Sequence, residues 1–227
     1  MGVDDLSKTL ARSTAVLFDF DGPLCDVFAG LPAPQVADEL ARQAASHDPT
    51  LSTKLTETDD PLEVLRLTFQ ADQDLGLQVE QALTSAEIKA VAVAGPPTPG
   101  AVASLEAAEA AGRRIAVVSN NSAECVRSFL VRHSLDGYVR EVIGRPVHRP
   151  DLMKPHPHSL YRAAELLEVA PSECVLIGDS LTDIQAAHEA GSAAIGYANK
   201  PHKRSVFIGA GAEAVTEHMG DIAEAMR

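Results

Sequence analysis

Short apolar runs alternate with helical stripes over most of the chain. An apolar run of about four to eight residues without polar alternation is typical of a strand buried on both faces of a parallel sheet. Apolar residues spaced three and four positions apart are typical of a helix packed on one side. The pattern predicts strands at 15–20, 114–119, 138–143, 174–178 and 192–197. It predicts helices at 101–111, 122–133, 157–168 and 181–190, and in the tail near 203–208 and 221–226.

The alternation of strands and helices after residue 95 predicts the fold class. Strands that alternate with helices in this way form a parallel sheet with helices on both faces. We therefore expect an α/β protein with a Rossmann-like parallel sheet core. Residues 1–13 look like a polar lead-in to the first strand.

The segment 27–95 has a different pattern, which is helical and without clear strands. Asp60 before Pro61 is a favourable helix start, because Asp is a good N-cap and Pro suits the first helical position. A Gly- and Pro-rich stretch at 95–100 closes the segment. Helices are predicted at 34–46, from 61 onward and at 78–93.

The position of this helical segment suggests an insertion. It separates the first strand from all the later ones, so the first strand must pair with strands that follow the segment in the sequence. We predict a core domain made of residues 1–26 and 96–227, and an inserted helical cap domain made of residues 27–95.

Composition and charge narrow the classes of partner. The chain has 227 residues, 45% of them hydrophobic, which is ordinary for a globular protein with a core. The formal net charge is −13 and no Lys/Arg-rich block is present. Nucleic acid is not expected as a partner, because binding the phosphate backbone needs a basic face. A small phosphorylated metabolite remains compatible with this charge, since a local cation can bind its phosphate.

Cysteine usage and the lack of long apolar runs indicate the compartment. Cys25, Cys125 and Cys174 are far apart and lack zinc-ligand spacing, so buried free thiols in a reducing compartment are expected. No apolar run approaches the ~20 residues that span a bilayer. The first residues are acidic and have no signal-peptide core. We expect no membrane partner and a cytoplasmic protein, either a monomer or a homodimer.

The first predicted strand ends in two carboxylates, Asp19 and Asp21, followed by Gly22 and Pro23. The carboxyl ends of parallel strands are where open α/β sheets bind ligands. Two neighbouring like charges favour a compensating cation, and a hard divalent ion that prefers oxygen ligands is suited to this. Asp residues also stabilise turns through side-chain hydrogen bonds. This stretch alone leaves both interpretations open.

Two later stretches could bind an anion. Ser119 ends a predicted strand, and Asn121 and Glu124 have the spacing of an N-cap and the third helical position, so Ser119 would face a helix N-terminus. An ordinary capped turn would use the same residue types. Lys154 lies in a proline-rich stretch that holds the chain extended, where its charge could meet a phosphate. A surface lysine is the alternative.

The strand predicted at 174–178 also ends in a carboxylate, Asp179. Asp183 could be a metal ligand or could orient the ligands. Ser180 and Asp183 also fit a capping box for the next helix. We expect Asp183 both to support the metal site and to cap the helix.

Taken in chain order, these groups resemble the motifs of the haloacid dehalogenase superfamily. Its members share Asp-x-Asp-Gly, a Ser or Thr after the second strand, a Lys in the third motif and Gly-Asp-x-x-x-Asp in the fourth. The resemblance extends from Val16 to about Gly196. The helical insert directly after the first motif looks like a subclass I cap. Taken together, the motifs resemble the phosphatase branch of the superfamily, phosphoglycolate phosphatase-like. Pro23 departs from the family, which usually has Thr there, and implies a stiffer loop.

The resemblance also implies roles for individual residues. Asp19 would be the nucleophile that forms an aspartyl-phosphate. Asp21 would act as general acid and then as general base. Mg²⁺ would be held by Asp19, the main-chain oxygen of Asp21 and Asp179, with Asp183 supporting.

The same resemblance assigns the phosphate ligands. Ser119, the Asn120 amide and Lys154 would bind the phosphate oxygens. Phosphoryl transfer depends mainly on positioning and charge neutralisation, and a carboxylate can form the covalent intermediate.

The implied function is a Mg²⁺-dependent phosphatase that hydrolyses a small phosphorylated metabolite. A phosphomutase similar to β-phosphoglucomutase is the main alternative, which would return phosphate to a sugar. A haloacid dehalogenase is disfavoured by Asp21, because that branch usually lacks the second aspartate and needs no metal. A non-catalytic phosphate-ligand binding protein is disfavoured by the intact set of Asp19, Asp21, Lys154 and Asp179.

Overall fold

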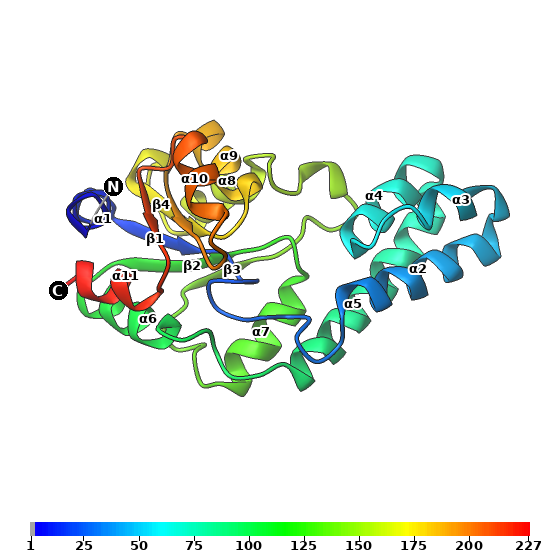
Figure 1. Cartoon of the computed structure of the whole chain (residues 1–227), viewed down its shortest axis with the longest axis horizontal. Coiled ribbons are helices and arrows are strands. Elements are labelled where there is room, and N and C mark those ends of the chain that lie inside the picture. Colours follow the sequence, from blue (N-terminus) through cyan, green and yellow to red (C-terminus); the bar gives the residue numbers. More distant parts are fainter. Residues whose placement is uncertain (1–2) are drawn as a thin grey trace.

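A six-stranded parallel sheet forms the centre of the computed structural model, which describes residues 3–227 (Figure 1). The strand order is β3-β2-β1-β4-β5-β6, and every neighbouring pair is parallel. β1 (Ala15–Phe18) therefore lies between β2 (Arg114–Val118) and β4 (Cys174–Gly178). The outer strands are β3 (Glu141–Ile143), β5 (Ala193–Tyr197) and β6 (Ala214–Thr216). The predicted α/β fold class is confirmed.

Helices cover both faces of this sheet. They are α1 (Val3–Ala11), α6 (Ala101–Ala110), α7 (Ala123–Arg132), α8 (His158–Leu166), α9 (Leu181–Ala190), α10 (Lys203–Gly209) and α11 (Gly220–Ala225). Single turns of 3₁₀ helix occur at Pro150–Leu152 and Pro171–Glu173.

The side chains of β1 alternate between two hydrophobic clusters. Val16 and Phe18 belong to the cluster that includes α1, α6, α7 and α11. Ala15 and Leu17 belong to the cluster that includes α8, α9 and α10. All four side chains are fully buried, which explains why polar alternation is absent from the strand. The core therefore places the end of β1 in the interior of the molecule.

Two elements of the core were not predicted. The 1–13 segment is not a plain lead-in, because α1 forms there and buries Leu6 and Leu10 on one side; residues 1 and 2 lie outside the described residues. β6 was missed because its three residues are too few to form a pattern. The first strand also ends two residues earlier than predicted, at Phe18.

The segment after β1 is helical, as predicted, and lies at the end of the molecule away from both termini (Figure 1). Asp60 caps α4 by accepting a hydrogen bond from the Leu62 N–H at 2.9 Å. Asp72 caps the next helix, which begins five residues before the predicted start at 78. The helices are α2 (Ala33–His47), α3 (Ser52–Leu55), α4 (Pro61–Ala71) and α5 (Gln73–Val93), with a 3₁₀ turn at Pro49–Leu51.

These helices share their own hydrophobic cluster, which includes Leu40, Leu65 and Leu83. The last turn of α5 differs, because Ala90 and Val91 belong to a cluster of the sheet. α5 thus connects the inserted helices to the sheet. The division at residues 26/27 and 95/96 stays a prediction, and we call 27–95 the cap.

Cys25, Cys125 and Cys174 are free and buried, as predicted. Among the described residues, no helix has the length and apolar character needed to cross a membrane.

Candidate active site

A cavity of about 440 Å³ lies at the carboxyl ends of β1, β2 and β4. Parallel strands bring their carboxyl ends to one edge, so residues far apart in sequence meet there. Cap residues line the opposite side of the cavity. The cavity is lined by all the side chains selected from the sequence, namely Asp19, Asp21, Ser119, Asn120, Lys154, Asp179 and Asp183.

Asp19 follows β1 directly and is buried, with 7% of its surface exposed. Its Oδ1 accepts hydrogen bonds from the Phe20 N–H and from Lys154 Nζ, each at 2.8 Å. Burial raises the pKa of Asp19 above its ordinary value, and the nearby Asp183 carboxylate raises it further, while Lys154 acts in the opposite direction. The carboxylate is held in one orientation at the bottom of the cavity.

Asp21 is separated from Asp19 by one residue and has its own partner. Its Oδ1 accepts a hydrogen bond from the Val27 N–H at 3.0 Å. Burial raises the pKa of Asp21 to about 6, despite that hydrogen bond. The two carboxylates therefore have different surroundings, although they share one loop.

Gly22 allows this loop to approach Asp179. Its φ of +101° lies in the region that favours glycine, and a Cβ there would lie 2.5 Å from Asp179 Cγ. Gly178 in β4 likewise allows a close approach of Asp183, since a Cβ on residue 178 would lie 2.4 Å from Asp183 Cβ. Both glycines make room for the carboxylate cluster.

Lys154 is buried, so the surface alternative is wrong for it. Its side chain is 2% exposed, and Nζ lies 2.8 Å from Asp19 Oδ1 and 2.6 Å from Asp183 Oδ1. Nζ also donates to the Val118 carbonyl at 3.0 Å. Burial disfavours the charged amine, but Asp183 and Asp19 outweigh this and raise the pKa of Lys154. The lysine is therefore a charged group between two carboxylates.

Asn120 fixes the main chain of Lys154. The Lys154 N–H donates to Asn120 Oδ1 at 2.9 Å, and Asn120 Nδ2 donates to the Lys154 carbonyl at 3.2 Å. The Asn120 side chain thus uses its oxygen and one of its two N–H groups on the Lys154 main chain. We expect a direct contact of Asn120 with a ligand to come from its main-chain N–H.

Ser119 is 1% exposed and is held by Asn121. Ser119 Oγ accepts from the Asn121 N–H at 3.0 Å and donates to Asn121 Oδ1 at 3.2 Å. The expected N-cap at Asn121 is wrong, because α7 begins one residue later and Ser122 accepts from the Cys125 N–H at 3.3 Å. The side chain of Asn121 is therefore free to orient the serine instead.

Asp19, Asp179 and Asp183 form a cluster that could hold a metal ion. Each offers a carboxylate oxygen, and these oxygens all lie within 4.8 Å of one another. Asp183 Oδ1 is buried and lies 2.6 Å from Lys154 Nζ, and no other described residue donates a hydrogen bond to it. An all-oxygen set of three clustered carboxylates fits a hard divalent cation such as Mg²⁺. The Asp21 carboxylate is outside this cluster, and its expected ligand atom is a main-chain oxygen.

The predicted capping box of α9 is present. The Asp183 N–H donates to Ser180 Oγ at 3.2 Å, and the Ser180 N–H donates to Asp183 Oδ2 at 3.0 Å. Asp183 is therefore oriented by the first turn of its own helix. Its other oxygen is turned toward Lys154.

Sequence reasoning missed the partners of Asp179. Lys203 Nζ lies 2.7 Å from Asp179 Oδ2, and Asn199 Nδ2 donates to the same oxygen at 2.9 Å. Both residues follow β5, whose carboxyl end lies at the same edge of the sheet. That position after a strand is the signal that could have identified them.

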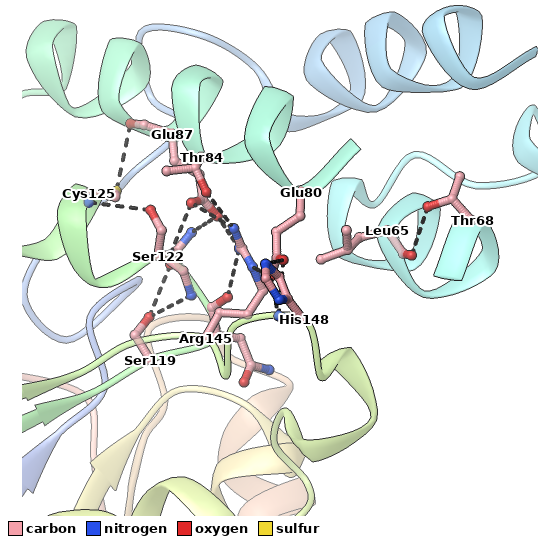
Figure 2. A network of polar contacts seen from close by, with 12 residues as sticks. Leu65, Thr68, Glu80, Thr84, Glu87, Ser119, Ser122, Cys125, Arg145 and His148 are labelled. Carbon is pink, nitrogen blue, oxygen red and sulfur yellow. Dashed lines mark hydrogen bonds and ion pairs between the residues drawn. The ribbon is translucent and has the colours of Figure 1, made fainter. Parts of the chain in front are cut away.

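A second group that was missed links the cap to the cavity (Figure 2). Glu87 on α5 is fully buried and accepts hydrogen bonds from Arg145 at 2.8 Å, the Ser122 N–H at 3.0 Å and Asn121 Nδ2 at 3.3 Å. Asn121 in turn holds Ser119. A carboxylate of the cap thus orients the loop that carries Ser119.

Arg145 is the centre of this network. Its guanidinium also donates to Thr84 Oγ1 and to the Asn120 carbonyl, each at 3.1 Å. Its Nε lies 3.6 Å from Glu80, which accepts from the His148 N–H at 3.0 Å. Figure 2 shows Glu80, Thr84 and Glu87 pointing from α5 toward Arg145. The spacing of the three residues along one helix was the available signal, but their partners are distant in sequence.

Comparison with known proteins agrees with this geometry. The family described as haloacid dehalogenase-like hydrolase matches residues 14–191. A phosphoglycolate phosphatase of Thiobacillus denitrificans is 32% identical over 187 residues, which cover 78% of this chain and 79% of that protein.

Solved structures share the fold. A predicted phosphoglycolate phosphatase from Haemophilus somnus has a TM-score of 0.68 at 19% identity, over 95% of this chain and 99% of that one. The β-phosphoglucomutase of Clostridium difficile has a TM-score of 0.67 at 16% identity, over 94% of this chain and 97% of that one. The family match and the curated relatives confirm the resemblance seen in the motifs. The chain therefore belongs to the haloacid dehalogenase-like hydrolase family, among its phosphatases.

Proposed function

We propose that the protein is a Mg²⁺-dependent phosphatase that hydrolyses a small phosphomonoester through an aspartyl-phosphate on Asp19. One observation carries the proposal. The Asp19 carboxylate lines the cavity, 2.8 Å from the Lys154 amine and in a cluster with Asp179 and Asp183 whose carboxylate oxygens lie within 4.8 Å of one another. This arrangement suits a nucleophile whose anionic target needs positive charge on several sides.

The first chemical step would break the bond between phosphorus and the leaving oxygen. An Asp19 oxygen attacks phosphorus and forms an acyl phosphate, while Asp21 donates a proton to the departing alcohol. In the second step, water attacks phosphorus and Asp21 takes its proton. Inorganic phosphate leaves, and Asp19 is regenerated.

The remaining residues would hold the phosphoryl group. Ser119, the Asn120 N–H and Lys154 are the candidate ligands of its oxygens. Mg²⁺ would neutralise negative charge when held by Asp19, Asp179 and the main-chain oxygen of Asp21, with Asp183 in support. Lys154 also keeps the Asp19 carboxylate oriented for attack, because it donates directly to Oδ1.

The class of substrate is proposed from the relatives and the size of the cavity. Curated relatives named phosphoglycolate phosphatase support a small phosphorylated metabolite. A cavity of about 440 Å³ has room for such a molecule. Lys154 is the one basic side chain among the described residues that line it, which suits a single phosphoryl group.

Release of inorganic phosphate from a panel of phosphomonoesters tests the proposal. Turnover is expected with Mg²⁺, and EDTA or Asp19→Asn is expected to abolish it. Asp136→Asn changes an exposed aspartate outside the cavity and serves as the matched control. Phosphate release by Asp19→Asn at the unchanged rate would refute the nucleophile. Accumulation of a sugar bisphosphate would identify a phosphomutase instead.

A further inference from the structure

Both sides of the active-site cavity carry carboxylates, but among the described lining residues only the sheet side carries a basic side chain. The sheet side carries the charged Lys154 and the carboxylate cluster that would hold Mg²⁺. The cap side lies where the rest of a substrate would extend beyond its phosphoryl group. Among the described residues there, the cap contributes no Lys, Arg or His. The cap side is apolar and acidic, and includes Phe28, Asp59, Asp60, Leu62, Leu83 and Glu87.

The acidic side chains on the cap side differ in their surroundings. The Glu87 carboxylate is bound by Arg145 and faces away from solvent, whereas Asp59 and Asp60 are exposed. The N-terminus of α4 does not offer an anion site, because Asp60 Oδ1 accepts from the Leu62 N–H at 2.9 Å.

Arg66 does not line the active-site cavity, which borders a neighbouring cavity at Thr182. Arg66 lines that neighbouring cavity, of about 830 Å³, and pairs with Glu63 at 3.4 Å. A carboxylate on the leaving group would therefore approach two aspartates and no cation from the cap.

On the basis of the proposed function, we infer that the leaving group is an uncharged alcohol, of the polyol or sugar class, rather than a carboxylate-bearing one. Hydroxyl groups can donate hydrogen bonds to Asp59 and Asp60. Phe28, Leu62 and Leu83 can cover a carbon skeleton. A second negative charge on the leaving group would be repelled by the same aspartates. This preference would distinguish the chain from relatives named for phosphoglycolate.

Matched pairs of substrates test the inference directly. 2-Hydroxyethyl phosphate and 2-phosphoglycolate differ only in a CH₂OH and a carboxylate, and glycerol 3-phosphate and 3-phosphoglycerate form a second pair. The uncharged member of each pair is expected to have a kcat/KM at least about tenfold higher, mainly through a lower KM. The ratio should fall as salt is added, because the repelling charges are exposed. A steric preference would not respond to salt.

Charge-removing variants test whether Asp59 and Asp60 cause the preference for the uncharged substrate. Asn caps a helix about as well as Asp, so the double change Asp59→Asn with Asp60→Asn removes charge and keeps the cap of α4. This variant is expected to reduce the ratio within each pair several-fold. Asp48→Asn is the matched control, because Asp48 also caps a helical turn in the cap but lies outside the cavity.

The outcomes separate the two proposals. Equal or better use of the carboxylate member, or a ratio that the double variant leaves unchanged, would overturn the inference alone. If p-nitrophenyl phosphate is hydrolysed but neither member of a pair is, their competitive inhibition constants should follow the same order, and the reverse order would overturn the inference. No Mg²⁺-dependent release from any phosphomonoester would overturn the proposed function and this inference with it.

Discussion

Lys154 is the residue on which the charge balance of the cavity depends. Its amine lies within 2.8 Å of Asp19 and 2.6 Å of Asp183, and its side chain is almost wholly buried. A buried carboxylate without a partner is much less stable than one in water. The lysine therefore stabilises the fold as well as orienting Asp19, the proposed nucleophile.

Lys154→Met keeps most of the side-chain volume and removes the charge. We expect loss of phosphatase activity and a decrease of about 3–5 kcal/mol in the free energy of unfolding, because Asp19 and Asp183 lose their buried partner. Denaturant unfolding in EDTA measures this without a contribution from metal. Lys89→Met, at an exposed position on α5, should leave stability within about 0.5 kcal/mol. Equal stability of the two variants would contradict the buried-pair account.

Gly22→Ala tests the close approach of the first loop to Asp179. The new Cβ would lie 2.5 Å from Asp179 Cγ, at a φ that alanine rarely adopts. The Mg²⁺ concentration for half-maximal activity is expected to rise at least about tenfold, because a displaced ligand lowers metal affinity. Gly137→Ala has open space around its Cβ and is the control. An unchanged Mg²⁺ requirement in Gly22→Ala would disprove the steric argument.

At the scale of elements, α5 has two functions. Its first part completes the hydrophobic cluster of the cap, and its last turn packs into a cluster of the sheet. Between them, Glu80, Thr84 and Glu87 contact Arg145 beside the loop that carries Ser119 (Figure 2). The helix thereby fixes the cap side of the cavity relative to the sheet side.

Arg145→Met should loosen this connection. Removing the guanidinium leaves the Glu87 and Glu80 carboxylates buried without their cation, which is expected to cost about 3–5 kcal/mol of stability. KM and the inhibition constant of inorganic phosphate should rise, since the loop around Ser119 loses its support. Arg149→Met is a matched control, because Arg149 pairs with Asp151 at the surface and both side chains are 59% exposed. Such an exposed pair contributes little to stability, because water screens it. Similar losses in both variants would contradict the role assigned to the buried network.

At the scale of the whole molecule, metal binding should be linked to folding. The cluster of Asp19, Asp179 and Asp183 comes from β1, β4 and α9 and exists only when the sheet is assembled. A ligand that binds only the folded state stabilises it. Metal binding at this cluster would therefore report whether the core is assembled.

Mg²⁺ at about a hundredfold excess over its Kd should add about 2.7 kcal/mol to the free energy of unfolding. In a protein of this size each kcal/mol raises Tm by about 2–4 °C. Thermal unfolding with Mg²⁺ and with EDTA measures the shift, which Asp179→Asn should abolish and Asp136→Asn should retain. A shift that persists in Asp179→Asn would place the ion elsewhere.

Much of the sheet could be predicted because its signals are local. The strand at 174–178 and the helix at 181–190 have the predicted bounds, since an apolar run and a capping box are each complete within a few residues. The short β6 and the terminal α1 were missed. β6 has only three residues, and α1 has a short apolar stripe, Leu6 and Leu10, that becomes buried through contacts with β6 and α11.

The candidate site was predictable to the extent that its residues follow strands. Asp19, Ser119 and Asp179 stand directly after β1, β2 and β4. The burial of Lys154 was not predictable, because it depends on Asp19, 135 residues away. Glu87 and Arg145 are 58 residues apart and were not paired from the sequence for the same reason.

The sequence by itself determined most of the elements and the groups that directly follow three of the strands, Asp19, Ser119 and Asp179. Both are local properties, since strand periodicity and chain order decide them. Only the tertiary structure decided which carboxylate meets which cation and which charges of the cap face the cavity. Those pairings depend on distances between side chains that packing brings together, and a buried ionic contact is stable only when each group reaches its partner.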